Sequence, residues 1–131
     1  MWVDIAILTK MRKKTKILII DDQPVVLTSL KYLIEEQGLG HIVATVSTGK
    51  ELLEVIEKAE PDMVLADIET SINGTVEALK TALSKNPQIR ILIMNKFLDT
   101  LRKNLKSNNF NHCLHTDTLN KKEFEKAIKR S

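Results

Sequence analysis

Short apolar runs alternate with longer amphipathic stretches along most of this chain of 131 residues. The runs place Ile, Leu and Val at consecutive positions, which is typical of strands that are buried on both faces. The stretches between them repeat apolar residues at helical spacing. This alternation predicts a parallel sheet in which helices connect successive strands. Strands are expected at residues 16–20, 41–46, 62–67, 89–95 and 110–115.

Turn and cap residues indicate where the helices begin and end. Pro24 suits the first turn of a helix, and Gly38 ends that helix. Thr48 and Glu51 form a capping box at the start of the next helix, which ends before Pro61. The apolar residues of that helix are Leu52, Leu53, Val55 and Ile56. Further helices are expected at residues 75–84, 97–106 and from 120 onward, with a loop at 68–74.

The strict alternation limits the topology. Five strands and five helices joined by right-handed crossovers predict an α/β fold, a doubly wound five-stranded parallel sheet. Ligands of such sheets bind beyond the carboxyl ends of the strands, where the strand order reverses.

Acidic residues follow two of the expected strands. Asp21 and Asp22 come directly after one strand, and Asp67 ends another. At ~4 Å each pair of carboxylates would repel by roughly 1 kcal/mol in water and about 4 kcal/mol near a protein surface. A divalent cation relieves this repulsion, and oxygen ligands suit Mg²⁺. The sequence therefore predicts a Mg²⁺ site at the carboxyl edge of the sheet.

Composition agrees with one globular domain. Hydrophobic residues make up 43% of the chain and charged residues 28%, and the net charge of +3 does not argue for direct nucleic-acid contact. Cys113 is the one cysteine, so no internal disulfide forms, and a cytoplasmic location is the simpler expectation. The apolar run at 5–8 is too short to span a membrane. We expect residues 1–14 to be a tail and 15–131 to form the domain.

Two other patterns have simpler explanations. Residues 45–50 contain part of a phosphate-binding loop, but Glu51 stands where that motif needs Ser or Thr, so the pattern is better explained as a helix cap. His112, Cys113 and His115 are metal-ligand types, but they alternate between the two faces of an expected strand, and no second cluster completes a zinc site.

Three segments together resemble the response-regulator receiver domain of bacterial two-component signalling. Residues 16–24 read Lys-Ile-Leu-Ile-Ile-Asp-Asp-Gln-Pro, residues 47–49 read Ser-Thr-Gly, and residues 61–68 read Pro-Asp-Met-Val-Leu-Ala-Asp-Ile. The resemblance covers about residues 15–130 and is closest to receivers that precede a helix-turn-helix DNA-binding domain. It implies a flavodoxin-like (βα)5 fold and a signalling module, not a turnover enzyme.

The resemblance also implies roles for individual residues. Asp67 matches the phosphoacceptor, whose carboxylate attacks a phosphohistidine and becomes an acyl phosphate. Asp22 matches the direct Mg²⁺ ligand, and Asp21 matches the acidic neighbour that positions the ion partly through water. The backbone carbonyl of Glu69 would be a further ligand. A histidine kinase or a phosphotransfer protein would be the phosphoryl donor.

This chain departs from the family pattern at the positions that sense phosphorylation. Asn95 stands where receivers place Thr or Ser, and residues 114–117 contain no lysine where receivers place one. The loop after Asp67 also lacks the usual proline. The missing cation removes a charge-assisted contact worth about 1.5–3 kcal/mol. We therefore expect an atypical or weakly switching receiver, with Lys96 as a candidate replacement for the cation.

Several alternatives stay open at this point. One is a receiver that acts through its surface without phosphorylation, and another is a small Mg²⁺-dependent phosphohydrolase, for which the chain has no spare residues to build a substrate pocket. Receivers of this family also form homodimers, here through a face that includes Leu101, Leu105 and Ala127. A DNA-binding output domain would be a separate part, outside this sequence.

Overall fold

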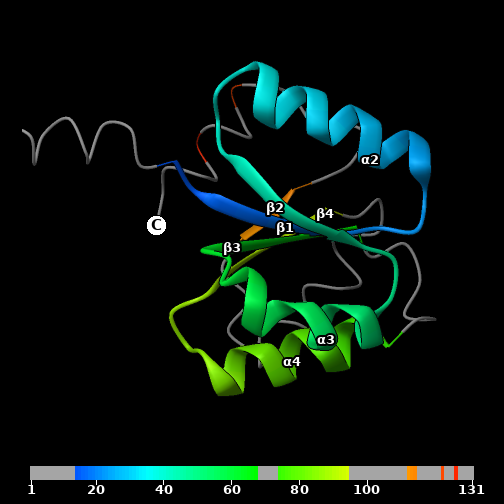
Figure 1. Ribbon diagram of the computed structural model, residues 1–131, viewed down its shortest axis with the longest axis vertical. Coiled ribbons are helices and arrows are strands. Elements are labelled where there is room, and N and C mark those ends of the chain that lie inside the picture. The colour runs from blue at the N-terminus through cyan, green and yellow to red at the C-terminus, as the bar shows by residue number, and fades with distance from the viewer. Residues whose placement is uncertain (1–13, 68–73, 95–111, 115–121, 123–125, 127–131) are drawn as a thin grey trace, which may run out of the picture.

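The protein forms a five-stranded parallel sheet between two layers of helices (Figure 1). The computed structural model describes residues 14–67, 74–94, 112–114, 122 and 126, with the backbone alone described at 67 and 112–114. The strand order is β2-β1-β3-β4-β5, which is the flavodoxin-like order expected from the alternation of strands and helices. The strands are β1 (Lys16–Ile20), β2 (His41–Val46), β3 (Met63–Asp67), β4 (Arg90–Met94) and β5 (His112–Leu114).

Helices cover both faces of this sheet. The helix α2 lies on one face, and α3 and α4 lie together on the other (Figure 1). α2 continues directly into a π-helical turn, η1, where one continuous α-helix was expected. The bounds are α2 (Pro24–Lys31), η1 (Tyr32–Glu36), α3 (Gly49–Ala59) and α4 (Thr75–Lys85).

The expected bounds match the described elements closely. β1 and β2 have the expected bounds, whereas β3 and β4 begin one residue later than expected. Of the strand predicted at 110–115, residues 112–114 are described, and they form β5. The helix predicted at 97–106 and most of the loop at 68–74 lie outside the described residues. Residues 122 and 126, within the last predicted helix, are helical.

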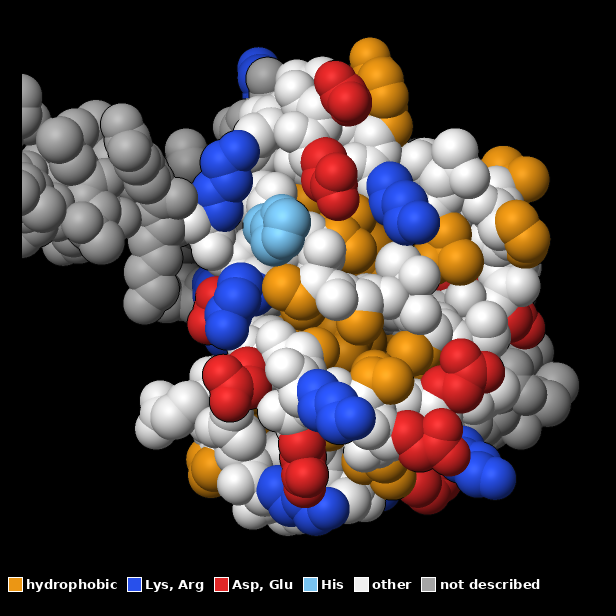
Figure 2. All heavy atoms as spheres, in the orientation of Figure 1, with side chains coloured by type: hydrophobic (Ala, Val, Ile, Leu, Met, Phe, Trp, Pro, Cys, Tyr) orange, Lys and Arg blue, Asp and Glu red, His pale blue; other side chains and the backbone are white. Residues whose placement is uncertain are grey.

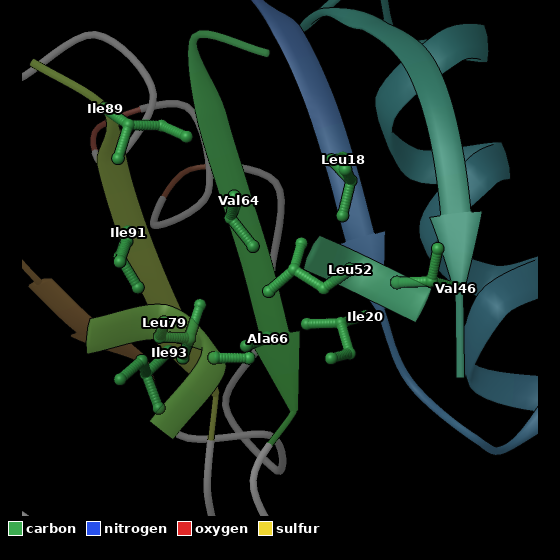
Figure 3. Close-up of a cluster of buried hydrophobic side chains, with 11 residues drawn as sticks. Leu18, Ile20, Val46, Leu52, Val64, Ala66, Leu79, Ile89, Ile91 and Ile93 are labelled. Carbon is green, nitrogen blue, oxygen red and sulfur yellow. The ribbon is translucent and has the colours of Figure 1, made fainter. Parts of the chain in front are cut away.

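Two apolar clusters fill the space between the sheet and its helices. Alternate residues of β1 enter opposite clusters: Leu18 and Ile20 face α3 and α4, and Ile17 and Ile19 face α2. All four are at most 2% exposed. This burial on both faces explains why the strand reads as an uninterrupted apolar run. Figure 3 shows the cluster beneath α3 and α4, where Leu52 lies among strand residues that include Ile20, Val46 and Val64.

The edge strand β2 contains an irregularity in its pairing with β1. Ile17 pairs with Ile42, but Leu18 pairs with Ala44, so Val43 is an extra residue in β2. Because of this bulge, Ile42 packs against the cluster under α2, whereas Ala44 packs against the opposite cluster. Bulges also help to protect an exposed edge from pairing with other chains. Figure 2 shows this side of the molecule, where apolar side chains reach the surface between charged ones.

Asp62 connects three strands at the amino edge of the sheet. Its N–H donates to the Lys16 carbonyl, and the Lys16 N–H donates to its Oδ2, both at 2.8 Å. Its carbonyl accepts the Arg90 N–H at 3.0 Å. Burial lowers the pKa of the Arg90 guanidinium below its ordinary value, and the charge of Asp62 opposes that shift. Through these hydrogen bonds Asp62 joins the starts of β1, β3 and β4.

Replacing Asp62 by alanine is expected to destabilise the fold. The Lys16 N–H loses its charged acceptor, which should lower the free energy of unfolding by about 1–3 kcal/mol. Urea denaturation followed by circular dichroism measures this change. The exposed Glu57 is a suitable control, since Glu57→Ala should change stability by less than about 0.5 kcal/mol. Equal losses in the two variants would contradict the structural role of Asp62.

Candidate functional site

The predicted site residues follow strands that pair side by side. In the parallel register of β1 with β3, Ile20 is opposite Ala66, so Asp21 and Asp67 are the next residues at the same edge. Asp67 is itself paired with Met94 at the end of β4. The chain leaves β1 toward β2 and leaves β3 toward β4, so the strand order reverses between β1 and β3. The two aspartates therefore lie at the switch point, where ligands of such sheets bind.

Asp21 is a buried acid with a fixed orientation. It is 4% exposed, its N–H donates to the Val46 carbonyl at 2.9 Å, and its Oδ1 accepts the Gln23 N–H at 2.8 Å. The first bond ties it to the end of β2, and the second forms a local turn that leads into Pro24 at the start of α2. Burying a carboxylate is costly, and hydrogen bonds, cations or metal ions offset that cost.

Asp22 has a different environment from its neighbour. It is exposed, although both residues follow the same strand and look equivalent in the sequence. The backbone turns into α2 immediately after it, so the two carboxylates differ in solvation. A buried acid beside an exposed one supplies oxygen donors at the sheet edge, and such donors fit Mg²⁺. The donor chemistry at this edge therefore agrees with the predicted metal site.

The start of α3 borders the same edge. The Thr48 Oγ1 accepts the Glu51 N–H at 3.1 Å, as the capping box predicts. The returning bond differs from the expected one, because the Glu51 Oε2 accepts the N–H of Ser47 at 3.4 Å instead of that of Thr48. The cap thus holds the residue directly after β2, next to the strand end that bonds to Asp21.

Other predicted site residues are outside the described part of the chain. These are Glu69, Asn95, Lys96 and residues 115–117, and for Asp67 the backbone alone is described. Among the side chains that the structure does describe, no three or more of His, Cys, Asp and Glu gather as a metal site. The register therefore brings the backbones of Asp21 and Asp67 together, and the predicted role of Glu69 stays a prediction.

Two cavities open at the opposite, amino edge of the sheet. Their volumes are about 420 and 530 Å³, and Pro61, Asp62, Asn86 and Ile89 line both. They are separated from Asp21 by the length of β1.

No helix in the described residues has the length and apolar character to cross a membrane.

Comparisons with a family model and with curated relatives agree with one another. A family model described as the response regulator receiver domain matches residues 17–128. The transcriptional regulatory protein LnrK of Bacillus subtilis is 34% identical over 85 residues, which cover 65% of this chain and 39% of the relative. A nitrate/nitrite response regulator protein homolog of Haemophilus influenzae is 32% identical over 84 residues, covering 64% and 40%. The chain thus spans about two fifths of the length of these relatives.

Solved structures show the same fold. A LuxR-family DNA-binding response regulator from Staphylococcus aureus superposes with a TM-score of 0.77 at 23% identity, over 88% of this chain and 97% of the other. A CheY-like receiver domain protein from Methanospirillum hungatei gives a TM-score of 0.74 at 22% identity, over 90% and 93%. At these identities the likeness concerns the fold alone.

Proposed function

The chain belongs to the response regulator receiver domain family, and we propose that within it Asp67 accepts a phosphoryl group with Mg²⁺ held at the carboxyl edge of the sheet. Receiver domains act in two-component phosphorelay signalling and are signalling modules, not turnover enzymes. The register that sets Asp21 beside Asp67 is the observation that carries this proposal.

The proposed chemistry uses residues at the switch point. A carboxylate oxygen of Asp67 attacks the phosphorus of a phosphohistidine, forming an O–P bond while the P–N bond breaks and its electron pair returns to the imidazole. Asp21 and Asp22, with the carbonyl of Glu69, would hold Mg²⁺. The ion would offset charge on the transferred group and align it with the nucleophile. The hydrogen bond from the Gln23 N–H keeps the Asp21 carboxylate in one orientation for that task.

The residues that would respond to phosphorylation differ from those of other receivers. Asn95 has an amide in place of the hydroxyl, and residues 114–117 contain no lysine to pair with the phosphoryl oxygens. The acyl phosphate would therefore form with one fewer charge-assisted contact, and the domain would switch weakly. The same substitutions favour a second candidate function, a receiver that binds its partner without phosphorylation.

Partners follow from the family. Response regulators receive phosphoryl groups from histidine kinases and often carry DNA-binding output domains. We propose that this chain takes its phosphoryl group from a histidine kinase or a phosphotransfer protein in the cytoplasm. An output domain of the DNA-binding kind, reached directly or through a homodimer, would receive the signal.

Beryllofluoride, which mimics an acyl phosphate, tests the proposed function. Calorimetry with the parent protein should show saturable binding of beryllofluoride in the presence of Mg²⁺ and loss of that binding with EDTA. An absence of binding at millimolar ion would overturn the phosphoacceptor role and support the phosphorylation-independent receiver. Steady turnover of a chromogenic phosphate ester would instead support the phosphohydrolase.

A further inference from the structure

The first residue of α3 lies against the residue that precedes α4. Gly49 is buried, and a Cβ built on it would lie 2.8 Å from the carbonyl carbon of Gly74, with the Gly74 oxygen nearer still. The same Cβ would lie 2.9 Å from the Cβ of Ala78. Any side chain at position 49 would therefore displace backbone atoms, so the missing side chain of glycine is what allows the two helices to meet.

Neither partner in this contact can move without losing other interactions. The carbonyl of Gly74 accepts the Ala78 N–H at 3.0 Å, which is the first helical hydrogen bond of α4. On the other side, the Thr48 carbonyl accepts the Leu52 N–H at 3.0 Å, and Leu52 is fully buried in the core. Gly49 and Gly74 therefore form a junction between two anchored helix ends.

This junction joins the two chain segments that flank the site. The segment before Gly49 begins at Val46, whose carbonyl accepts the N–H of Asp21. The segment before Gly74 begins at Asp67, the proposed phosphoacceptor. A shift of Gly74 relative to Gly49 would therefore move the point at which the connection from Asp67 joins α4.

We propose that Gly49 is a positioning residue for the phosphoacceptor site. Because it lets α3 approach the Gly74 carbonyl, it sets where the segment after Asp67 ends relative to the segment bonded to Asp21. The functional part of this inference rests on the proposed function, whereas its structural part can be tested without any phosphoryl chemistry.

The test compares Gly49→Ala with a matched variant at the other edge of the sheet. A Cβ on Gly40 would also be crowded, at 2.9 Å from the Thr15 carbonyl oxygen and 2.7 Å from the Ile17 Cδ1, although the second atom is the end of a flexible side chain. In NMR spectra, the backbone amide resonances of Asp21 and Asp67 should change their chemical shifts in Gly49→Ala and remain unchanged in Gly40→Ala. Beryllofluoride binding in the presence of Mg²⁺ should weaken at least about tenfold in Gly49→Ala and should not weaken in Gly40→Ala.

Gly74→Ala tests the junction from its other side, should Gly49→Ala fail to fold. Gly74 has a φ of +65°, and a Cβ there would meet nothing within 4 Å, so alanine strains the backbone without a clash. The amide resonances of Gly49 and Asp67 should both shift.

Each outcome separates this inference from the proposed function. Unchanged Asp67 resonances in Gly74→Ala, or equal changes in Gly49→Ala and Gly40→Ala, would overturn the positioning role. If the parent binds no beryllofluoride, the phosphoacceptor role fails, and the amide resonances alone decide whether Gly49 positions the segment.

Discussion

Asp67→Asn is expected to abolish phosphoryl uptake by this protein. An amide lacks the anionic oxygen that attacks phosphorus, so an acyl phosphate cannot form at residue 67. Incubation with acetyl phosphate and Mg²⁺, followed by intact-protein mass spectrometry, should show at least about a 100-fold drop in the initial rate of modification. That drop corresponds to about 2.7 kcal/mol of lost transition-state stabilisation.

Asp62 provides a matched control in the same part of the chain. It directly precedes β3, whereas Asp67 ends that strand, so the two acids lie at opposite edges of the sheet. Asp62→Asn makes the same chemical change and should leave the rate of modification within about twofold of the parent. Modification that persists in Asp67→Asn, while Asp62→Asn keeps the rate of the parent, would show that the acceptor is elsewhere.

The central strands β1, β3 and β4 could be predicted from the sequence because they are buried on both faces. β1 has an apolar side chain at each of its last four positions, and the apolar run ends where the strand ends. The bulge at Val43 was not predicted, since an extra residue in this edge strand does not alter the pattern of a short, mainly apolar run. The π-helical turn at Tyr32–Glu36 was also not predicted, because helical periodicity does not distinguish it from the end of an α-helix.

The sequence was sufficient to predict where the site residues lie on the sheet, but not how buried each of them is. Asp21 and Asp67 follow strands, so the topology alone brings their backbones to one edge. The difference in burial between Asp21 and Asp22 depends on how the chain turns into α2 and contacts β2, which local sequence does not specify. The sequence indicates that Gly49 belongs to a helix cap, but its contact with Gly74 brings together the starts of two helices and depends on the three-dimensional fold.

Leu52→Ala is expected to cause a large loss of stability. Leu52 has no exposed surface and lies among residues of three strands, including Ile20, Val46 and Val64 (Figure 3). Truncation would remove buried apolar contacts and leave a cavity that the rigid sheet cannot fill. The free energy of unfolding should fall by about 2–5 kcal/mol. Urea denaturation followed by circular dichroism measures the loss.

The adjacent leucine shows whether this loss depends on the orientation of α3. Leu52 and Leu53 are adjacent apolar residues of the same helix, but the structure buries Leu52 fully and Leu53 only partly. Because Leu53→Ala removes the same atoms from a partly solvated position, it should cost less than about 1.5 kcal/mol. Equal losses for the two variants would mean that α3 is rotated about its axis. That rotation would also separate Gly49 from Gly74, because both contacts depend on the same face of one helix.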